Sequence, residues 1–271
     1  MTTPKSFYLL GGRELYILAG LICCILLASA AYVLWLPDVA EFRKKNPAET
    51  SFMRIKEAQA RAQGKKLGRT ILWTNWDGIS ENLKHAVLVA EDGGFYQHHG
   101  VDWDSTGKAL ETDWKQKRLA KGGSTITQQV ARNLYLSPSK NPLRKIKEIL
   151  IARRLEKVLG KRRIFEIYLN IAEWGKGIYG AEAAAEAYFG KSAADLTPEE
   201  GAALAAALPS PRRYNPTGGT RFMEREKSRI VNRMRASGYL PDETEEELLD
   251  ENFAALTSTD TAVKTSTSAI N

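Results

Sequence analysis

The sequence has few of the residues on which disulfides and zinc sites depend. It contains two cysteines, Cys23 and Cys24, which are adjacent and lie within an apolar run. Adjacent cysteines rarely bridge each other, so a disulfide framework and a cysteine metal site are both excluded. The three histidines, His85, His98 and His99, lack zinc-site spacing with other ligands. The chain is therefore neither a disulfide-stabilised scaffold nor a zinc-finger protein.

Strand-like alternation is also scarce, and Thr70 to Trp73 is the clearest example. Helix signals recur instead, as capping residues followed by apolar residues at helical spacing. Examples are the N-cap Asn141 with Pro142 after it, and the capping box Thr197-Pro198-Glu199-Glu200. They predict helices over residues 82–92, 124–136, 142–159, 162–170 and 198–208. The body of the protein is therefore predicted to be mainly α-helical.

One long apolar run, LYILAGLICCILLASAAYVLWL, spans Leu15 to Leu36 without a charged residue. Its 22 residues suffice to cross a hydrocarbon core of roughly 30 Å as a helix. The alternative is a cleaved signal peptide, since Ala28-Ser29-Ala30 resembles a cleavage site. Apolar character continues past Ala30, which favours a single transmembrane anchor.

Charge is unevenly distributed along the chain. Residues 241–271 hold eight acidic side chains and one basic one, whereas the whole chain has a net charge of +7. The remaining body is therefore strongly basic, which indicates an anionic partner such as nucleic acid, phospholipid headgroups or a phosphate-bearing substrate.

These patterns divide the chain into five predicted segments. They are a polar tail (1–14), the transmembrane helix (15–36), a charged juxtamembrane connector with some helix (37–69), the folded domain (70–240) and an acidic tail that we expect to be disordered (241–271). More Lys and Arg follow the apolar run than precede it, which by itself favours a cytoplasmic body. Long domains translocate largely regardless of charge, so charge alone does not determine on which side of the membrane the body lies.

Glu91 lies at the predicted end of a helix, one turn after Val87 and Leu88. Partial burial and the negative end of the helix dipole would both raise the pKa of its carboxyl. Such a carboxylate suits a general base. The alternative is an ordinary solvated acid or an ion-pair partner.

Glu148 lies on a predicted apolar helix stripe with Ile151, Ala152 and Leu155. An ionised group on a buried face needs a partner or a function, and Arg144, one turn earlier, could be that partner. Two further acids are rivals for a catalytic role: Glu156, which we expect to be solvated, and Glu166.

The stretch GGSTITQQVARN, residues 122–133, places two glycines before a predicted helix with Ser124 as its N-cap. A helix N-terminus of this kind is a natural anion site. Ser124, Gln128 and Arg132 are four residues apart, which predicts one polar face able to bind a phosphate or diphosphate. The alternative is a solvated helix face.

Together these motifs resemble the peptidoglycan glycosyltransferase family, which is related to the glycosyltransferase domain of class A penicillin-binding proteins. EDGGFYQHHG (91–100) is similar to the family's ED-x-x-F-x-x-H-x-G motif, GGSTITQQVARN to its second motif and RKIKE (144–148) to its third. RRIFEIYLN, YGAEAAAEAYFGK and ALPSPRRYNP follow in the family's order. The resemblance covers about residues 70–235, and the short remainder favours the monofunctional type, without a transpeptidase domain.

The resemblance implies a lysozyme-like α-helical domain that faces the periplasm and is held in the cell inner membrane by one helix. It also implies polymerisation of lipid II into β-1,4 glycan strands, with inversion and with release of undecaprenyl diphosphate. Glu91 would be the catalytic base for the acceptor hydroxyl, and Glu148 would support the donor diphosphate, directly or through Mg²⁺ or Mn²⁺. No organic cofactor is implied. The substrate-binding positions that match the family motifs are Asp92, Phe95, His98, Ser124, Thr125, Gln128, Gln129, Arg132, Asn133, Arg144 and Lys145.

Arg132 departs from the lysine that the family usually has at this position. The charge is kept, but a guanidinium differs in geometry from an ammonium. The expected partners are lipid II, the growing glycan strand, membrane lipids and other cell wall synthesis proteins, without nucleic acid. Two alternatives are a lytic, lysozyme-like enzyme that cleaves peptidoglycan and a membrane-tethered module that binds nucleic acid or phospholipid.

Overall fold

The computed structural model describes residues 12–65, 68–104, 106–107, 123–139 and 141–242. The chain forms two compact units: unit 1 comprises residues 1–67 and 95–171, and unit 2 comprises residues 68–94 and 172–271. Of the predicted terminal tails, residues 1–11 and 243–271 lie outside the described part of the chain. Each unit has its own helices and its own apolar core.

The elements described in unit 1 are all helical. They are α1 (Gly12–Leu34), the 3-10 helix η1 (Ala40–Arg43), α2 (Ser51–Ala62), α5 (Ile126–Tyr135), α6 (Pro142–Val158) and α7 (Lys161–Ile171).

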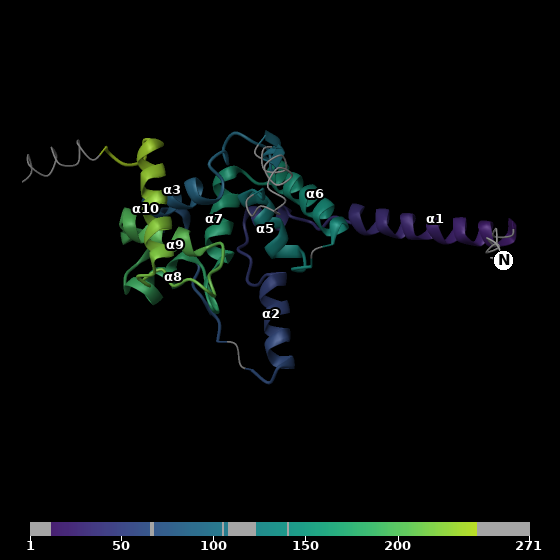
Figure 1. The fold of residues 1–271 in the computed structure, drawn as a ribbon, viewed down its shortest axis with the longest axis horizontal. Helices are drawn as coiled ribbons and strands as arrows, with labels where there is room; N and C mark the ends of the chain where they lie inside the picture. The colour runs from purple at the N-terminus through teal and green to yellow at the C-terminus, as the bar shows by residue number, and fades with distance from the viewer. Residues whose placement is uncertain (1–11, 66–67, 105, 108–122, 140, 243–271) are drawn as a thin grey trace, which may run out of the picture. The chain divides into compact units, whose positions relative to one another are not determined.

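Helix α1 is the long apolar helix that the sequence predicts, and Figure 1 shows it as a single continuous helix. Its segment Leu15–Leu34 has a mean hydropathy of 2.6 and is not buried in the protein. By length and composition it can cross a membrane, which is consistent with membrane anchoring.

Helix α5 forms the centre of unit 1 and packs against α2, α6 and α7 (Figure 1). Its apolar side chains Ile126 and Val130 are fully buried, as are Ile151 and Leu155 of α6. The predicted connector (37–69) contains α2, which contacts α5. The connector therefore contributes to this core.

Unit 2 combines helices with a small sheet. Its elements are β1 (Thr70–Ile71), η2 (Trp76–Gly78), α3 (Glu81–Glu91), β2 (Glu173–Gly175), β3 (Ile178–Tyr179), α8 (Ala181–Phe189), η3 (Ala193–Asp195), α9 (Pro198–Ala207) and α10 (Arg221–Ala236).

The sheet has the strand order β1-β3-β2, with β1 parallel and β2 antiparallel to β3. Helix α9 packs against both α3 and α10 (Figure 1). Gly201 permits the close approach to α3, because a Cβ there would lie 3.1 Å from the backbone of Asn82. Small side chains therefore allow α9 to pack closely against its neighbours, beside larger buried side chains such as Trp174 and Leu83.

The capping residues explain why the helices begin where they do. Asn141 caps α6, with Pro142 in its first turn, as the sequence predicts. Thr197 and Glu200 form the predicted capping box of α9. The prediction of a mainly helical protein with one N-terminal apolar helix is confirmed.

Candidate active site

Helix α5 begins at Ile126, and its N-cap is Thr125. The Thr125 Oγ1 accepts a hydrogen bond from the Gln128 N–H (3.2 Å), and the Gln128 Oε1 accepts one from the Thr125 N–H (3.0 Å). This is a capping box, which requires Gln or Glu three residues after the cap. Ser124, the predicted cap, is followed three residues on by Thr127, whose short side chain is not of this type. The prediction of Ser124 as N-cap is therefore wrong.

The capping box also buries Gln128, whose exposed fraction is 2%. Gln128 therefore does not share an exposed face with Ser124 and Arg132, although a spacing of four residues predicts one. The positions of α5 that are half-buried are Gln129, Arg132, Asn133 and Tyr135.

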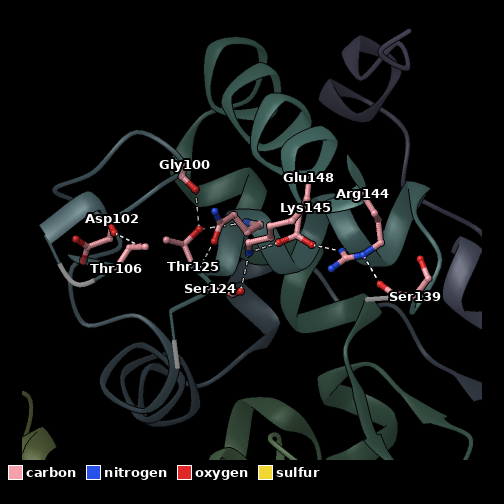
Figure 2. A network of polar contacts seen from close by, with 10 residues as sticks. Gly100, Asp102, Thr106, Ser124, Thr125, Ser139, Arg144, Lys145 and Glu148 are labelled. Carbon is pink, nitrogen blue, oxygen red and sulfur yellow. Dashed lines mark hydrogen bonds and ion pairs between the residues drawn. The ribbon is translucent and has the colours of Figure 1, made fainter. Parts of the chain in front are cut away.

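Gly100 lies against the start of α5 and close to the backbone of α6. Its carbonyl accepts a hydrogen bond from the Thr125 hydroxyl (2.7 Å), as Figure 2 shows, and its N–H donates to the His98 Nδ1 (3.2 Å). The φ of Gly100 is +88°, and a Cβ there would lie 3.2 Å from the backbone carbonyl of Ala152. Only glycine meets both conditions without strain.

Glu148 is the centre of a charged cluster on α6 (Figure 2). Its side chain is 1% exposed, its Oε2 accepts a hydrogen bond from the Arg144 Nη1 (2.5 Å), and its Oε1 accepts one from the Lys145 Nζ (2.6 Å). The prediction that Arg144 pairs with Glu148 is confirmed, and Lys145 is a second partner. Burying a carboxylate is costly unless it is paired and hydrogen-bonded, and both conditions are met here.

The cluster reaches two further segments of unit 1. The Lys145 Nζ donates a hydrogen bond to the Ser124 Oγ (3.0 Å), and the Arg144 Nε donates one to the carbonyl of Ser139 (2.5 Å). Two cationic side chains surround one carboxylate, so the cluster keeps a net positive charge. Because the Lys145 side chain is 40% exposed, part of that charge is accessible to a ligand.

Arg132 has an unusual environment on the half-buried face of α5. Its Nε is buried and has no hydrogen-bond partner among the residues that the structure describes. The guanidinium carbon lies 5.9 Å from the centre of the Phe52 ring, which holds the side chain by a cation–π contact. A buried donor without a partner is costly, and a ligand oxygen would satisfy it.

Other candidates in unit 1 have structural neighbours. Phe95 is fully buried, with its ring centre 5.5 Å from that of Phe165, so it packs in the core. The Gln129 Oε1 accepts a long hydrogen bond from the Tyr168 hydroxyl (3.4 Å). Asn133 is half-buried on the same helix.

Glu91 is the last residue of α3 in unit 2, as predicted. It is half-buried, and its neighbours one turn back, Val87 and Leu88, are buried. Asp92 follows as the C-cap, 8% exposed, and its N–H donates to the Leu88 carbonyl (2.9 Å). Glu91 and Asp92 thus belong to unit 2, whereas the other candidate residues lie in unit 1.

Of the two rival acids, Glu156 is buried, although the sequence predicts that it is solvated. Its side chain is 8% exposed rather than solvated, and its Oε1 accepts hydrogen bonds from the Thr127 Oγ1 (2.6 Å) and the Lys161 Nζ (2.7 Å). These partners come from α5 and α7, so neighbouring residues in sequence gave no sign of them. Glu166 pairs with Arg163 (2.9 Å). Both acids therefore have structural partners.

The surroundings of Glu148 do not fit a divalent cation. Both of its carboxylate oxygens accept hydrogen bonds from cationic side chains, which occupy the positions that a metal would need. Within the described ranges, no group of three or more His, Cys, Asp or Glu side chains is placed to hold a metal ion.

Comparison with known proteins gives a consistent match. The transglycosylase family model matches residues 59–235. The biosynthetic peptidoglycan transglycosylase of Janthinobacterium sp. (strain Marseille) is 46% identical over 192 residues, covering 71% of this chain and 83% of that protein. Those of Azoarcus sp. (strain BH72) and Chromobacterium violaceum are 46% and 43% identical, over 73% and 83% of this chain and over 87% and 97% of their own lengths.

Proposed function

The chain belongs to the transglycosylase family and is a peptidoglycan glycosyltransferase that polymerises glycan strands, and from this premise we propose how its residues act. The substrate is lipid II, and the growing glycan strand is the other reactant. The reaction forms a bond between the acceptor O4 and the donor C1, with inversion, and breaks the bond from C1 to the diphosphate. The acceptor hydroxyl loses its proton, and the electron pair leaves with undecaprenyl diphosphate.

The donor diphosphate binds at the cluster around Glu148. The observation that carries this proposal is the arrangement of Arg144 and Lys145, which are bonded to one buried carboxylate and retain a net positive charge. Guanidinium and ammonium groups are strong diphosphate binders. Glu148 acts as a positioning residue, because it fixes both cations in one geometry before substrate arrives. Such preorganised charge stabilises the departing diphosphate without reorganisation during the reaction.

Ser124 and Arg132 extend this site along α5. The Ser124 hydroxyl is bound to Lys145, and the unpartnered Nε of Arg132 offers a further donor to an anionic ligand. The remaining substrate-binding positions proposed from the family motifs are Asp92, Phe95, His98, Thr125, Gln128, Gln129 and Asn133. Thr125 and Gln128 contribute by fixing the start of α5.

Glu91 is the proposed general base, which accepts the proton of the acceptor 4-hydroxyl. Its place in the last turn of α3, beside buried Val87 and Leu88, gives the partly desolvated setting that suits this task. No step of the proposed reaction passes through a metal ion, since Glu148 already has two cationic partners.

The proposed location is the inner membrane, with α1 as a single span and the catalytic body in the periplasm. The lipid of the substrate stays in the bilayer while its headgroup reacts, so an enzyme tethered by one helix remains at its substrate. Membrane lipids and other cell wall synthesis proteins are the expected partners.

A direct test compares Glu91→Gln with a matched control, Glu186→Gln, which changes an exposed acid on α8. Polymerisation of lipid II should fall by about 10²–10⁴-fold in the first variant, which is the usual contribution of general acid–base catalysis. The control should match wild type. Unchanged polymerisation by Glu91→Gln would show that the base is another residue.

The same preparation should be given preformed glycan, to separate synthesis from the lytic alternative. Cleavage requires a general acid for the leaving sugar oxygen, whereas synthesis requires a diphosphate site. Soluble fragments released from preformed glycan, without polymerisation of lipid II, would contradict the proposal.

A further inference from the structure

Unit 1 contains a cavity of about 650 Å³ that no part of the proposed reaction uses. It lies beside the C-terminal half of α6, and its lining includes Leu36, His99, Arg153, Arg154, Glu156 and Lys157. None of these residues takes part in the cluster around Glu148.

The cavity has an excess of positive charge. The side chains of Arg153, Arg154 and Lys157 are exposed, and they have no ion-pair partner within the described part of the chain. The one carboxylate of the lining, Glu156, is already neutralised by Lys161 at 2.7 Å. The three cations are therefore available to an anion that enters the cavity.

The position of the cavity indicates which anion this is. Leu36 lies two residues after the end of α1, so the cavity opens where the apolar helix ends. A helix of this length extends about 34 Å at 1.5 Å per residue, slightly more than the roughly 30 Å of a hydrocarbon core. The end of α1 therefore reaches the level of the lipid phosphates when the helix spans a bilayer.

Two contacts keep α6 beside this end of α1. The Lys147 Nζ lies 4.1 Å from the centre of the Tyr32 ring, and α1 and α6 are in contact. Trp35 follows at 81% exposure, in the position typical of an aromatic side chain at the membrane interface. The cavity and the membrane anchor thus belong to one local structure.

We propose that this cavity binds the phosphate group of an anionic phospholipid of the surrounding membrane, such as phosphatidylglycerol. Arg153 and Arg154 can bind phosphate oxygens bidentately, and Lys157 adds a further charge. The apolar side chain of Leu36 faces the same cavity and would contact the glycerol end of the acyl chains. The proposal goes beyond glycan polymerisation and rests on α1 as a membrane span. The bound lipid would fix the catalytic body at one height above the bilayer.

The test is native mass spectrometry of the full-length protein, released from a neutral detergent to which one lipid is added. The probes are dioleoyl phosphatidylglycerol, dioleoyl phosphatidylcholine with the same acyl chains, and inorganic phosphate. We expect retention of one phosphatidylglycerol, at a concentration about tenfold below that required for phosphatidylcholine. Inorganic phosphate should not displace it at equal concentration.

The variant Arg153→Gln/Arg154→Gln/Lys157→Gln removes the three cations of the cavity. Retention of phosphatidylglycerol should weaken by at least about tenfold, because one cation near an anionic lipid contributes roughly fivefold. The control Lys44→Gln/Lys45→Gln/Arg54→Gln removes the same charge from exposed positions of unit 1 outside the cavity. It should weaken retention by less than about twofold.

Equal losses in the two variants would overturn the proposal in favour of diffuse attraction between a basic protein and anionic lipid. Unchanged retention in the cavity variant, or displacement by inorganic phosphate, would overturn it as well. If the triple variant does not fold, Arg154→Gln alone should weaken retention about fivefold. Lipid retention is measured without lipid II, so this test is independent of the proposed reaction.

Discussion

The helix contacts of the two units are built from different kinds of residue. In unit 1, α5 and α6 bury three polar side chains beside their apolar ones: Thr127, Gln128 and Glu148. In unit 2, α9 contacts α3 and α10 through glycine, alanine and leucine. Replacing a buried ion pair by apolar residues is often neutral or stabilising, so ionic contacts are weak evidence for stability. Thr127 and Gln128 hold Glu156 and the start of α5 in place. The charged cluster around Glu148 instead keeps excess positive charge, which indicates a role in ligand binding, whereas the apolar contacts of α9 in unit 2 serve stability.

Unit 2 also has a buried cation, Lys84, whose surroundings differ from those of Arg144 and Lys145 in unit 1. Its Nζ is bonded to Glu81 on the same helix (2.7 Å) and lies 4.3 Å from the centre of the Trp76 ring. Lys84 is thus satisfied by its immediate neighbours. Arg144 and Lys145 instead gather around a carboxylate and retain excess charge.

The largest effect on stability is expected in unit 2, from Leu204→Ala in α9. Leu204 is fully buried, and such a truncation costs about 2–5 kcal/mol in the free energy of unfolding. Denaturant unfolding measures this loss. The polymerisation rate per folded molecule should stay at the wild-type value. A rate that falls with stability would show that the packing of α9 also determines activity.

The converse effect is expected in unit 1, from Arg144→Met. This change removes one cation from the cluster, and loss of one such preorganised donor lowers kcat by about 10²-fold. The free energy of unfolding should fall less than it does for Leu204→Ala, because Lys145 still neutralises Glu148. Steady-state kinetics with lipid II measure the first effect and denaturant unfolding the second. If the variant unfolds at a lower denaturant concentration than wild type but polymerises at the wild-type rate, Arg144 serves stability and not diphosphate binding.

A smaller effect is expected from Arg132→Lys, which restores the lysine usual in the family. Both side chains carry one positive charge, but the guanidinium is the planar, bidentate binder. Because the charge is kept, we expect the variant to polymerise lipid II. A wild-type protein that is inactive until it receives this lysine would show that Arg132 is not an equivalent residue.

The smallest effect concerns pH and unit 2. Burial lowers the pKa of His85 below 6.5, although Glu81 opposes the shift, and the ring stacks on Tyr239 at 3.9 Å. A lowered pKa stabilises the folded protein above pH 6.5, and this contribution is lost as pH falls through 6.5 toward the folded-state value. His85→Phe keeps a stacked ring without a titrating group. Its Tm should therefore fall less than that of wild type between pH 7.5 and about 5.5.

Much of this architecture could be predicted from local sequence signals. Asn141-Pro142 and Thr197-Pro198 specify helix starts through neighbouring residues, and the apolar stripe after Glu148 predicts its burial. These features depend on helical periodicity, which a single sequence contains. The start of α5 also has a local signal, because Thr125-Ile126-Thr127-Gln128 has the capping-box pattern. Ser124, directly before it, is an equally good cap when considered alone.

The contacts that determine the site could not be read in this way. Ser124 meets Lys145 across 21 residues, and Glu156 meets Thr127 across 29. Such pairs depend on how α5, α6 and α7 pack, which periodicity does not specify. For the same reason the sequence predicts a solvated Glu156, with Arg153 and Lys157 beside it, whereas packing against α5 and α7 buries it.

Glu148 is proposed to organise the diphosphate site, and Glu91 to act as the base. The most direct test is equilibrium binding of undecaprenyl diphosphate, the proposed product, to full-length wild type, Glu91→Gln and Glu148→Gln in neutral detergent. Glu91→Gln should bind within about twofold of wild type, whereas Glu148→Gln should bind at least about tenfold more weakly, or about 1.4 kcal/mol. Wild-type affinity in Glu148→Gln would show that Glu148 does not organise the diphosphate site.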